Sequence, residues 1–343
     1  MALSATQPAI LRSSHRLPDS QIIAACLCDE GRQIQVLASG GESLAPYRPP
    51  VAADTLLRGP DGKLCLAADG KLFALSIQDG RVTAAPFGVV PRAVRAIRHV
   101  EGSRYVLLSG GAVTAHGLRG CDLLLADIHN GSAHRSDQVG PQQHPQFVET
   151  GTLGGVAVVL VGVRTRAVFD DRLRLRPWIF AVDGTGLRPV WLGTSFSRPF
   201  QGAAFCDCVK DEGEEICAVE LTRGGDRQII AYRKRGLVVE AVARSAAGAF
   251  GSQLRSLPQR AQAGELLCIW AGGCTGRILG MRAAAAPGRE VVLLLPVVQT
   301  DYIKRPLAWD VGWKDGRPAA FVLQAGKDFH SRALKRYNGS YER

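Results

Sequence analysis

Five arginines crowd into a short segment near the middle of the chain, between residues 164 and 176. They are Arg164, Arg166, Arg172, Arg174 and Arg176. In the second half of the segment arginine alternates with leucine, and alternate residues of a β-strand point to the same side. We therefore expect Arg172, Arg174 and Arg176 to share one strand face, with Trp178 beside them. Guanidinium groups donate paired hydrogen bonds to carboxylates and phosphates, so this segment predicts a site for an anionic ligand or an acidic protein partner.

A second basic point lies at Arg233, Lys234 and Arg235, where a turn between two apolar runs predicts a hairpin tip. The whole chain has 42 basic and 31 acidic residues, a formal charge of +11, which favours anionic partners. Nucleic acid would bind such a surface through its phosphates, in a salt-dependent way. Only 6% of the residues are aromatic, and no stacking motif accompanies the arginines. A protein partner is therefore favoured over RNA.

Cysteines are the next residues that could do chemistry. Nine are present, and the pairs Cys26/Cys28 and Cys206/Cys208 could together offer four thiolates to zinc. The two pairs open different repeat units, however, and most of the cysteines lie in apolar runs, where a free thiol packs as a small hydrophobe. Buried packing is favoured, and no metal is expected. An odd number of cysteines in such runs indicates a reducing compartment, the cytoplasm, with an organellar matrix as the alternative.

Three histidines, His129, His134 and His144, lie in or beside the polar stretch of residues 132–144, together with two aspartates. A metal site or a general base would need these side chains to converge, which spacing alone does not predict, so a solvated loop is favoured. The sequence carries no nucleophile elbow, Walker A loop or dinucleotide-binding glycine motif. No catalytic residue is predicted, and a non-enzymatic role is favoured.

The elements that position these residues can be inferred from residues 201–248. This stretch holds four short apolar runs separated by three polar or glycine-containing turns. Each run is mostly β-branched or aromatic, and each turn carries the Gly, Asp or Arg that hairpins tolerate. Four antiparallel strands at this spacing are typical of one blade of a β-propeller.

Similar units recur along the chain, with openings near residues 22, 55, 94, 147, 204, 265 and 308. The pattern predicts an all-β fold, a β-propeller of seven blades of four-stranded antiparallel sheets, with six blades as the alternative count. Two β-sandwiches are the rival architecture. Residues 252–264 are expected to form a helical or irregular insertion, and the N-terminal strand is expected to complete the final blade.

The domain organisation follows from the same units. Residues 20–343 are predicted to form a single propeller domain, and residues 1–19 a flexible leader. A short organellar presequence is the alternative for the leader, which has no acidic residue before Asp19 but carries basic residues. No stretch approaches the roughly 18 apolar residues of a membrane-spanning helix.

Two units resemble FG-GAP/VCBS-type propeller repeats: residues 205–219 (FCDCVKDEGEEICAV) and 308–322 (AWDVGWKDGRPAAFV). Such repeats pair a strand ending in Asp with an Asp- and Gly-rich loop and a second apolar strand. The resemblance covers about three units and implies a propeller fold. In that family the loop often binds calcium, but the loops here keep too few spaced aspartates for a cage of six to eight oxygens, so calcium is disfavoured.

Three functional interpretations remain open. The favoured one is a non-catalytic propeller scaffold, a subunit of a larger assembly that binds an acidic or anionic partner through its arginine-rich face. The first alternative is a propeller enzyme whose active site lies at the channel mouth, where residues from several blades converge. The second alternative is nucleic-acid binding through the arginine strand.

Overall fold

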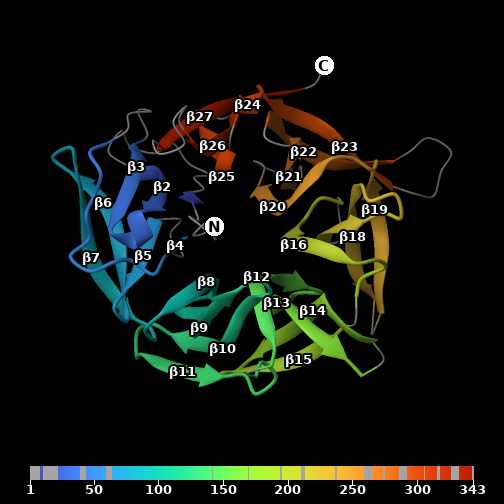
Figure 1. The fold of residues 1–343 in the computed structure, drawn as a ribbon, viewed down its shortest axis with the longest axis horizontal. Coiled ribbons are helices and arrows are strands. Elements are labelled where there is room, and N and C mark those ends of the chain that lie inside the picture. Colours follow the sequence, from blue (N-terminus) through green and yellow to red (C-terminus); the bar gives the residue numbers. More distant parts are fainter. Residues whose placement is uncertain are drawn as a thin grey trace. The chain divides into compact units, whose positions relative to one another are not determined.

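The computed structural model consists of β-strands joined by turns (Figure 1). It describes residues 8–10, 22–38, 44–58, 64–140, 142–168, 170–193, 195–209, 213–235, 238–258, 265–272, 275–285, 292–304, 306–314, 317–325 and 332–341. Within these ranges the one helical element is a short 3-10 turn, η1, at Asp29–Gly31. Hydrogen bonds join the described strands into five sheets, one of three strands, three of four strands and one of 12 strands. The 12-stranded sheet contains three antiparallel groups in succession, so the strands form seven groups, called sheets below, five with four strands and two with three. The fold is a β-propeller, as the sequence predicts.

Contacts divide the chain into two compact units. The first comprises Met1–Gly110, Leu124–His134 and Ile303–Gly339, and the second comprises Gly111–Leu123, Arg135–Tyr302 and Ser340–Arg343. The third sheet, of order β11-β10-β9-β8, contributes residues to both units. Its strands are β8 (Val94–Glu101), β9 (Arg104–Thr114), β10 (Gly117–Asp127) and β11 (Ser132–Arg135).

The first unit contains the first, second and last groups of strands. The first group is β1 (Pro8–Ile10), β2 (Ile22–Cys28) and β3 (Gln33–Ala38). The second is β4 (Thr55–Arg58), β5 (Leu64–Ala68), β6 (Lys71–Gln78) and β7 (Arg81–Val89). The last is β25 (Pro306–Lys314), β26 (Arg317–Ala325) and β27 (Arg332–Tyr341), preceded by the short β24 (Ile303–Lys304). Aliphatic side chains fill the space between the first and second sheets, among them Ile34, Val36, Leu64 and Leu66.

Turn chemistry explains the hairpins of the second sheet. Asp69-Gly70 joins β5 to β6 and Asp79-Gly80 joins β6 to β7, and all four residues have positive φ. Two consecutive positive φ values define the turn whose twist matches that of paired strands, and Asp-Gly is its preferred sequence. The Asp-Gly pairs of the sequence thus account for both hairpins.

The N-terminal strand differs from the prediction. Pro8–Ile10 lies within the expected flexible leader, yet it forms β1 and pairs with β2 in an antiparallel register. The strand therefore adds to the first sheet, rather than completing the last one as expected; β25 of the last sheet lies beside it. A three-residue strand has too little sequence to show an alternating pattern, and pairing with β2 supplies its order.

The second unit contains the fourth, fifth and sixth groups of strands. The fourth is β12 (His144–Leu153), β13 (Val156–Ala167), β14 (Asp170–Asp183) and β15 (Gly186–Leu192). The fifth is β16 (Phe200–Cys206), β17 (Glu215–Leu221), β18 (Arg227–Arg235) and β19 (Val238–Ser245). The sixth is β20 (Phe250–Pro258), β21 (Glu265–Gly272), β22 (Thr275–Ala285) and β23 (Val292–Thr300). The inner strand of each sheet packs beside that of the next: β12 beside β16 and β16 beside β20 (Figure 1).

The sixth sheet corrects a second expectation. Residues 252–258 belong to strand β20, which pairs with β21, and are not a helical or irregular insertion. Residues 259–264 of the expected insertion lie outside the described residues. The inward positions of β20 include Ser256 as well as Leu254, and Ser256 Oγ donates to the carboxylate of Glu265. A buried polar residue interrupts the apolar pattern from which strands are predicted, because its partner lies on the neighbouring strand.

A buried carboxylate fixes the segment that leads into the fifth sheet. Glu220 of β17 is fully buried, and it accepts hydrogen bonds from the hydroxyls of Ser197 (2.8 Å) and Tyr232. The ring of Phe196 stacks on Tyr232 with centroids 4.8 Å apart. Burial, and then the hydrogen bond to Glu220, raise the pKa of Tyr232 well above its usual value. The neutral phenol therefore stays a hydrogen-bond donor throughout the physiological pH range.

Candidate functional site

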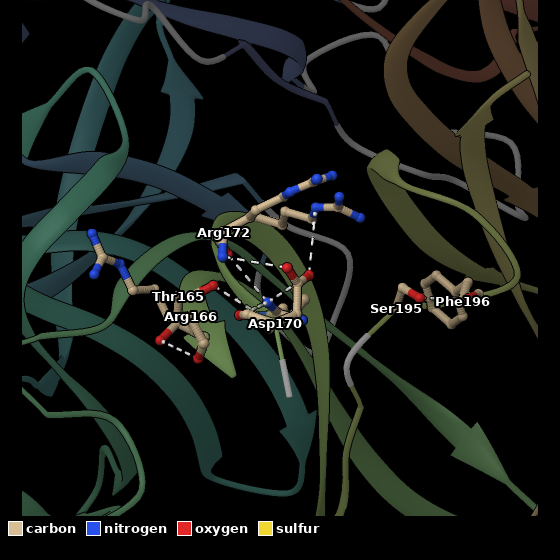
Figure 2. Close-up of polar contacts among 8 residues, drawn as sticks. Thr165, Arg166, Asp170, Arg172, Ser195 and Phe196 are labelled. Atoms are coloured by element: carbon tan, nitrogen blue, oxygen red, sulfur yellow. Dashed lines mark hydrogen bonds and ion pairs between the residues drawn. The ribbon is translucent and has the colours of Figure 1, made fainter. Parts of the chain in front are cut away.

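The arginine-rich segment forms the turn-proximal ends of β13 and β14, and one of its arginines is internal. Arg176 is only 2% exposed. Its Nε donates to the carbonyl of Thr165 (2.9 Å), and its Nη2 donates to the carbonyls of Asp170 (3.0 Å) and Arg172 (3.2 Å) and to the Asp170 carboxylate (3.2 Å) (Figure 2). This guanidinium satisfies the backbone of the hairpin end and is not available to a partner.

The two other arginines of the alternating run are accessible to solvent. Arg172 is exposed, and Arg174 forms an ion pair with Asp170 at 3.5 Å, its side chain 37% exposed. Desolvation acts to raise the pKa of Asp170, but the backbone amide of Arg172 and the guanidinium groups of Arg176 and Arg174 outweigh it and hold the pKa below its usual value. Asp170 thus stays ionised and neutralises part of the cluster.

The first two arginines of the segment point elsewhere. Arg164 lies opposite Leu175 in the β13–β14 register, whereas Thr165 lies opposite Arg174. Directly paired residues project from the same face, so Arg164 is on the face opposite to Arg174. The register shifts at Arg166, which is exposed, and Figure 2 shows its side chain directed away from Arg172 and Asp170. The segment therefore presents basic groups in two directions.

Trp178, the aromatic residue of the predicted site, lies farther along β14. It pairs with Val161 of β13 and Leu192 of β15 and is half-buried in the middle of the sheet. Its position between two aliphatic partners gives it a packing role in the fourth sheet. The exposed guanidinium groups of Arg166 and Arg172 lie nearer the turn.

The second basic point contains another internal arginine. Arg233 pairs with the fully buried carboxylate of Glu215, and its own side chain is 11% exposed. Lys234 is exposed, and the side chain of Arg235 lies outside the described residues. Among the described side chains of these three residues, Lys234 is the cation that faces solvent.

Three thiols surround Glu215. Cys206, Cys208 and Cys217 are buried, and the sulfurs of Cys208 and Cys217 are 3.5 Å apart. The Glu215 carboxylate accepts hydrogen bonds from the backbone amides of Cys208 and Val209, each at 3.1 Å. Burial, and then the Cys208 thiolate, raise the pKa of Glu215 to about 7 although Arg233 acts to lower it.

The pKa values of Cys206 and Cys208 shift in opposite directions. Hydrogen bonds from Cys206 and Cys217 lower the pKa of Cys208, while burial raises the pKa of Cys206. Such packing agrees with the prediction for Cys206 and Cys208; the side chains of Cys26 and Cys28 lie outside the described residues. Across the described ranges no three His, Cys, Asp or Glu side chains are positioned to hold a metal ion.

The histidines converge in a way that the sequence does not predict. His144 begins β12 and lies opposite Arg164 of β13. Its ring meets that of His116, in the β9–β10 turn, edge to face with centroids 6.3 Å apart. Residues 132–135 of the expected loop form β11, and the His129 amide donates to Asp127 in a local turn. His116 comes from a different sheet, 28 positions away, so spacing gives no signal for the pair.

Strand directions place most of these basic residues at one end of the fourth sheet. The chain enters β12 at His144, at the same end as the β13–β14 turn, because the four strands alternate in direction. Arg166, Arg172 and Arg174 flank that turn. At the opposite end, Thr152 donates to Glu214, beside the β16–β17 turn. Lys234 precedes the β18–β19 turn and belongs to this second end, so the two predicted basic points are separated.

Ser195 lies two positions after Gly193, in the segment between β15 and β16. The hydroxyl of Ser195 donates to the carbonyl of Phe196 at 2.8 Å (Figure 2). The described part of the chain also contains no helix of the length and apolarity that crossing a membrane requires.

Comparison with known proteins identifies the fold. The sequence matches no protein-family model, and no curated protein is significantly similar to it. Among solved structures, BBS1N in complex with ARL6DN has 11% identity and a TM-score of 0.54, covering 99% of this chain and 98% of its own. The Dos1 propeller has 11% identity and a TM-score of 0.52, covering 94% and 75%. A virginiamycin B lyase from Staphylococcus aureus with quinupristin has 10% identity and a TM-score of 0.50, covering 99% and 96%. At such identities the similarity shows the propeller fold. It does not show that the chain belongs to the FG-GAP/VCBS family.

Proposed function

We propose that this protein is a non-catalytic β-propeller scaffold, a subunit of a larger assembly that binds an acidic partner at the exposed arginines of the β13–β14 end. The observation that carries the proposal is the state of Arg166 and Arg172. Both side chains are exposed, and neither forms an ion pair with any residue in the described ranges. The two arginines therefore keep their charge and their hydrogen-bond donors for a second molecule.

The charge of the surrounding segment supports the same proposal. Residues 164–176 contain five arginines and two aspartates, a formal charge of +3. The guanidinium of Arg176 is buried and pairs with the Asp170 carboxylate. The excess positive charge of the segment therefore resides on the arginine side chains that reach solvent. Complementary charge speeds encounter and orients a partner, and its effect weakens with salt. One propeller of similar fold was solved with a protein bound to it, BBS1N with ARL6DN.

The test is affinity purification of the tagged chain from its native cells, at low and at moderate salt, with mass spectrometry of the bound proteins. The wild type is compared with an Arg166→Glu/Arg172→Glu variant. The charge-matched control is Arg81→Glu/Arg188→Glu, because both residues are exposed and each lies beside the turn before the last strand of its sheet.

We expect a stoichiometric acidic partner that the wild type and the control retain and the Arg166/Arg172 variant loses. If the partner binds both variants equally, the arginine end is not its site. Recovery of a monomeric chain alone would overturn the scaffold and favour the enzymatic alternative. Recovery of nucleic acid, released steeply by salt, would favour the third interpretation.

A further inference from the structure

We propose that His116, Arg119, His144 and Arg164 form a binding site for a small dianionic oxyanion, a phosphate or a phosphate monoester. The site goes beyond the proposed partner surface and does not depend on it. Its four residues come from three strands or turns of the second unit: His116 and Arg119 from the β9–β10 hairpin, His144 from β12 and Arg164 from β13.

Backbone packing sets the β9–β10 turn against the start of β12, and His144 at that start lies opposite Arg164 of β13. A Cβ atom at Gly117 would lie 2.8 Å from the carbonyl oxygen of Pro145, so the turn lies directly against the start of β12. The side-chain amide of Gln146 donates to the carbonyl of His116 at 3.1 Å and ties the turn in place. Since Gly117 also has a φ of +118°, a residue without a side chain is required for this approach.

The charged groups that act on His144 are all basic. Burial lowers the pKa of His144 first, and the positive charges of His116, Arg119 and Arg164 lower it further. No carboxylate is among the groups that act on this imidazole from the β9–β10 hairpin or from β13. Four basic groups thus meet without a counter-charge among the described residues.

Two buried nitrogen atoms of the cluster also lack a hydrogen-bond partner within the described chain. They are the Nδ1 atom of His144 and the Nε atom of Arg164. Buried polar atoms are usually hydrogen-bonded, and clusters of unsatisfied donors with shared positive charge are suited to an anion. His116 and Arg119 are exposed, so the cluster is open to solvent on one side.

The number and geometry of the donors favour a phosphoryl group. Two guanidinium groups and two imidazoles approach from different strands, and the tetrahedral oxygens of a phosphate can accept from several directions at once, whereas a carboxylate accepts in one plane. A dianion also matches the charge of two arginines before either histidine is protonated. Because the bound dianion favours the imidazolium form of His144, phosphate binding and proton uptake strengthen each other, and affinity increases as the pH falls.

The experiment uses the whole chain and follows the ring protons of His116 and His144 by NMR during pH titrations, with and without inorganic phosphate at constant ionic strength. We expect phosphate to raise the pKa of His144 in the wild type. In Arg119→Met and in Arg164→Met the Kd for phosphate should increase by about tenfold each, as expected for the loss of one charge-assisted hydrogen bond. The Arg81→Met/Arg188→Met variant is the control and should bind as the wild type does.

A second arm distinguishes the source of the phosphate. O-phosphoserine that binds more tightly than inorganic phosphate would support a phosphorylated protein as the ligand, and equal or weaker binding would support a free phosphate. The proposal is overturned if phosphate leaves the titration of His144 in the wild type unchanged, or if both arginine variants bind phosphate as tightly as the control. Neither result bears on the partner surface at Arg166 and Arg172.

Discussion

Arg172 and Arg176 lie four positions apart on the same face of β14, yet one is exposed and the other is among the most deeply buried side chains of the described protein. The difference comes from the backbone around the hairpin. Three carbonyl groups converge on Arg176 together with the Asp170 carboxylate, and they replace the water that a guanidinium would otherwise need. The sequence shows the alternation of the arginines but not the carbonyls that select one of them.

Removing that guanidinium should weaken the fold. Arg176→Met leaves three backbone carbonyl groups and the Asp170 carboxylate without this donor, and we expect the free energy of unfolding to decrease by about 3 kcal/mol. Urea unfolding of the purified variant measures this change. Arg172→Met is the matched control and should stay within about 0.5 kcal/mol of the wild type, since its side chain is exposed. Equal losses in both variants would contradict the structural role of Arg176.

Glu215 makes stability depend on pH in a defined direction. Its pKa is raised from 4.5 to about 7 in the folded protein, so between these values the folded state binds more protons than the unfolded state. The stabilisation is complete below pH 4.5 and is lost as the pH rises through 7. We expect the stability advantage of the wild type over Glu215→Gln to be larger at pH 5 than at pH 8.

Chemical unfolding at the two pH values measures that advantage. Asp226→Asn, which changes an exposed carboxyl in the β17–β18 turn, is the control, and its difference from the wild type should vary less with pH. An advantage that grows from pH 5 to pH 8 would show that Glu215 is ionised in the folded state and stabilised mainly by Arg233.

At the scale of the elements, close approach between inner strands holds neighbouring sheets together. A Cβ atom at Gly202 of β16 would lie 2.0 Å from the carbonyl oxygen of Ser252 in β20, and that backbone atom cannot rotate away. We expect Gly202→Ala to reduce the free energy of unfolding by about 1–3 kcal/mol through overpacking. Gly186→Ala is the control, because its nearest neighbour would be 3.8 Å away. Thermal unfolding that ranks Gly186→Ala as the more damaging change would contradict the packing of β16 on β20.

Most strands could be predicted because each unit repeats local signals. The Asp-Gly turns and alternating runs are properties of a few consecutive residues, and they predicted the all-β propeller. One mispredicted element, β20, has Ser256 at an inward position, where its hydrogen bond to Glu265 on the next strand replaces apolar burial. The pairing of His116 with His144 was missed for a related reason. It depends on the contact between the β9–β10 turn and β12, which neither segment encodes alone.

At the scale of the whole molecule, two explanations of polyanion binding, by total net charge or by a localised basic surface, predict different effects of charge reversal. Net charge alone would give any two double Arg→Glu variants the same affinity for a polyanion. Each such variant changes the formal charge by −4, from +11 to +7. A localised basic surface instead predicts that Arg166→Glu/Arg172→Glu elutes from immobilised heparin at lower salt than Arg81→Glu/Arg188→Glu, because contacts concentrated on one surface release more counterions. Elution of both variants at the same salt concentration would mean that the total charge determines binding, and the arginines around the β13–β14 turn would then have no special role in attracting an anionic partner.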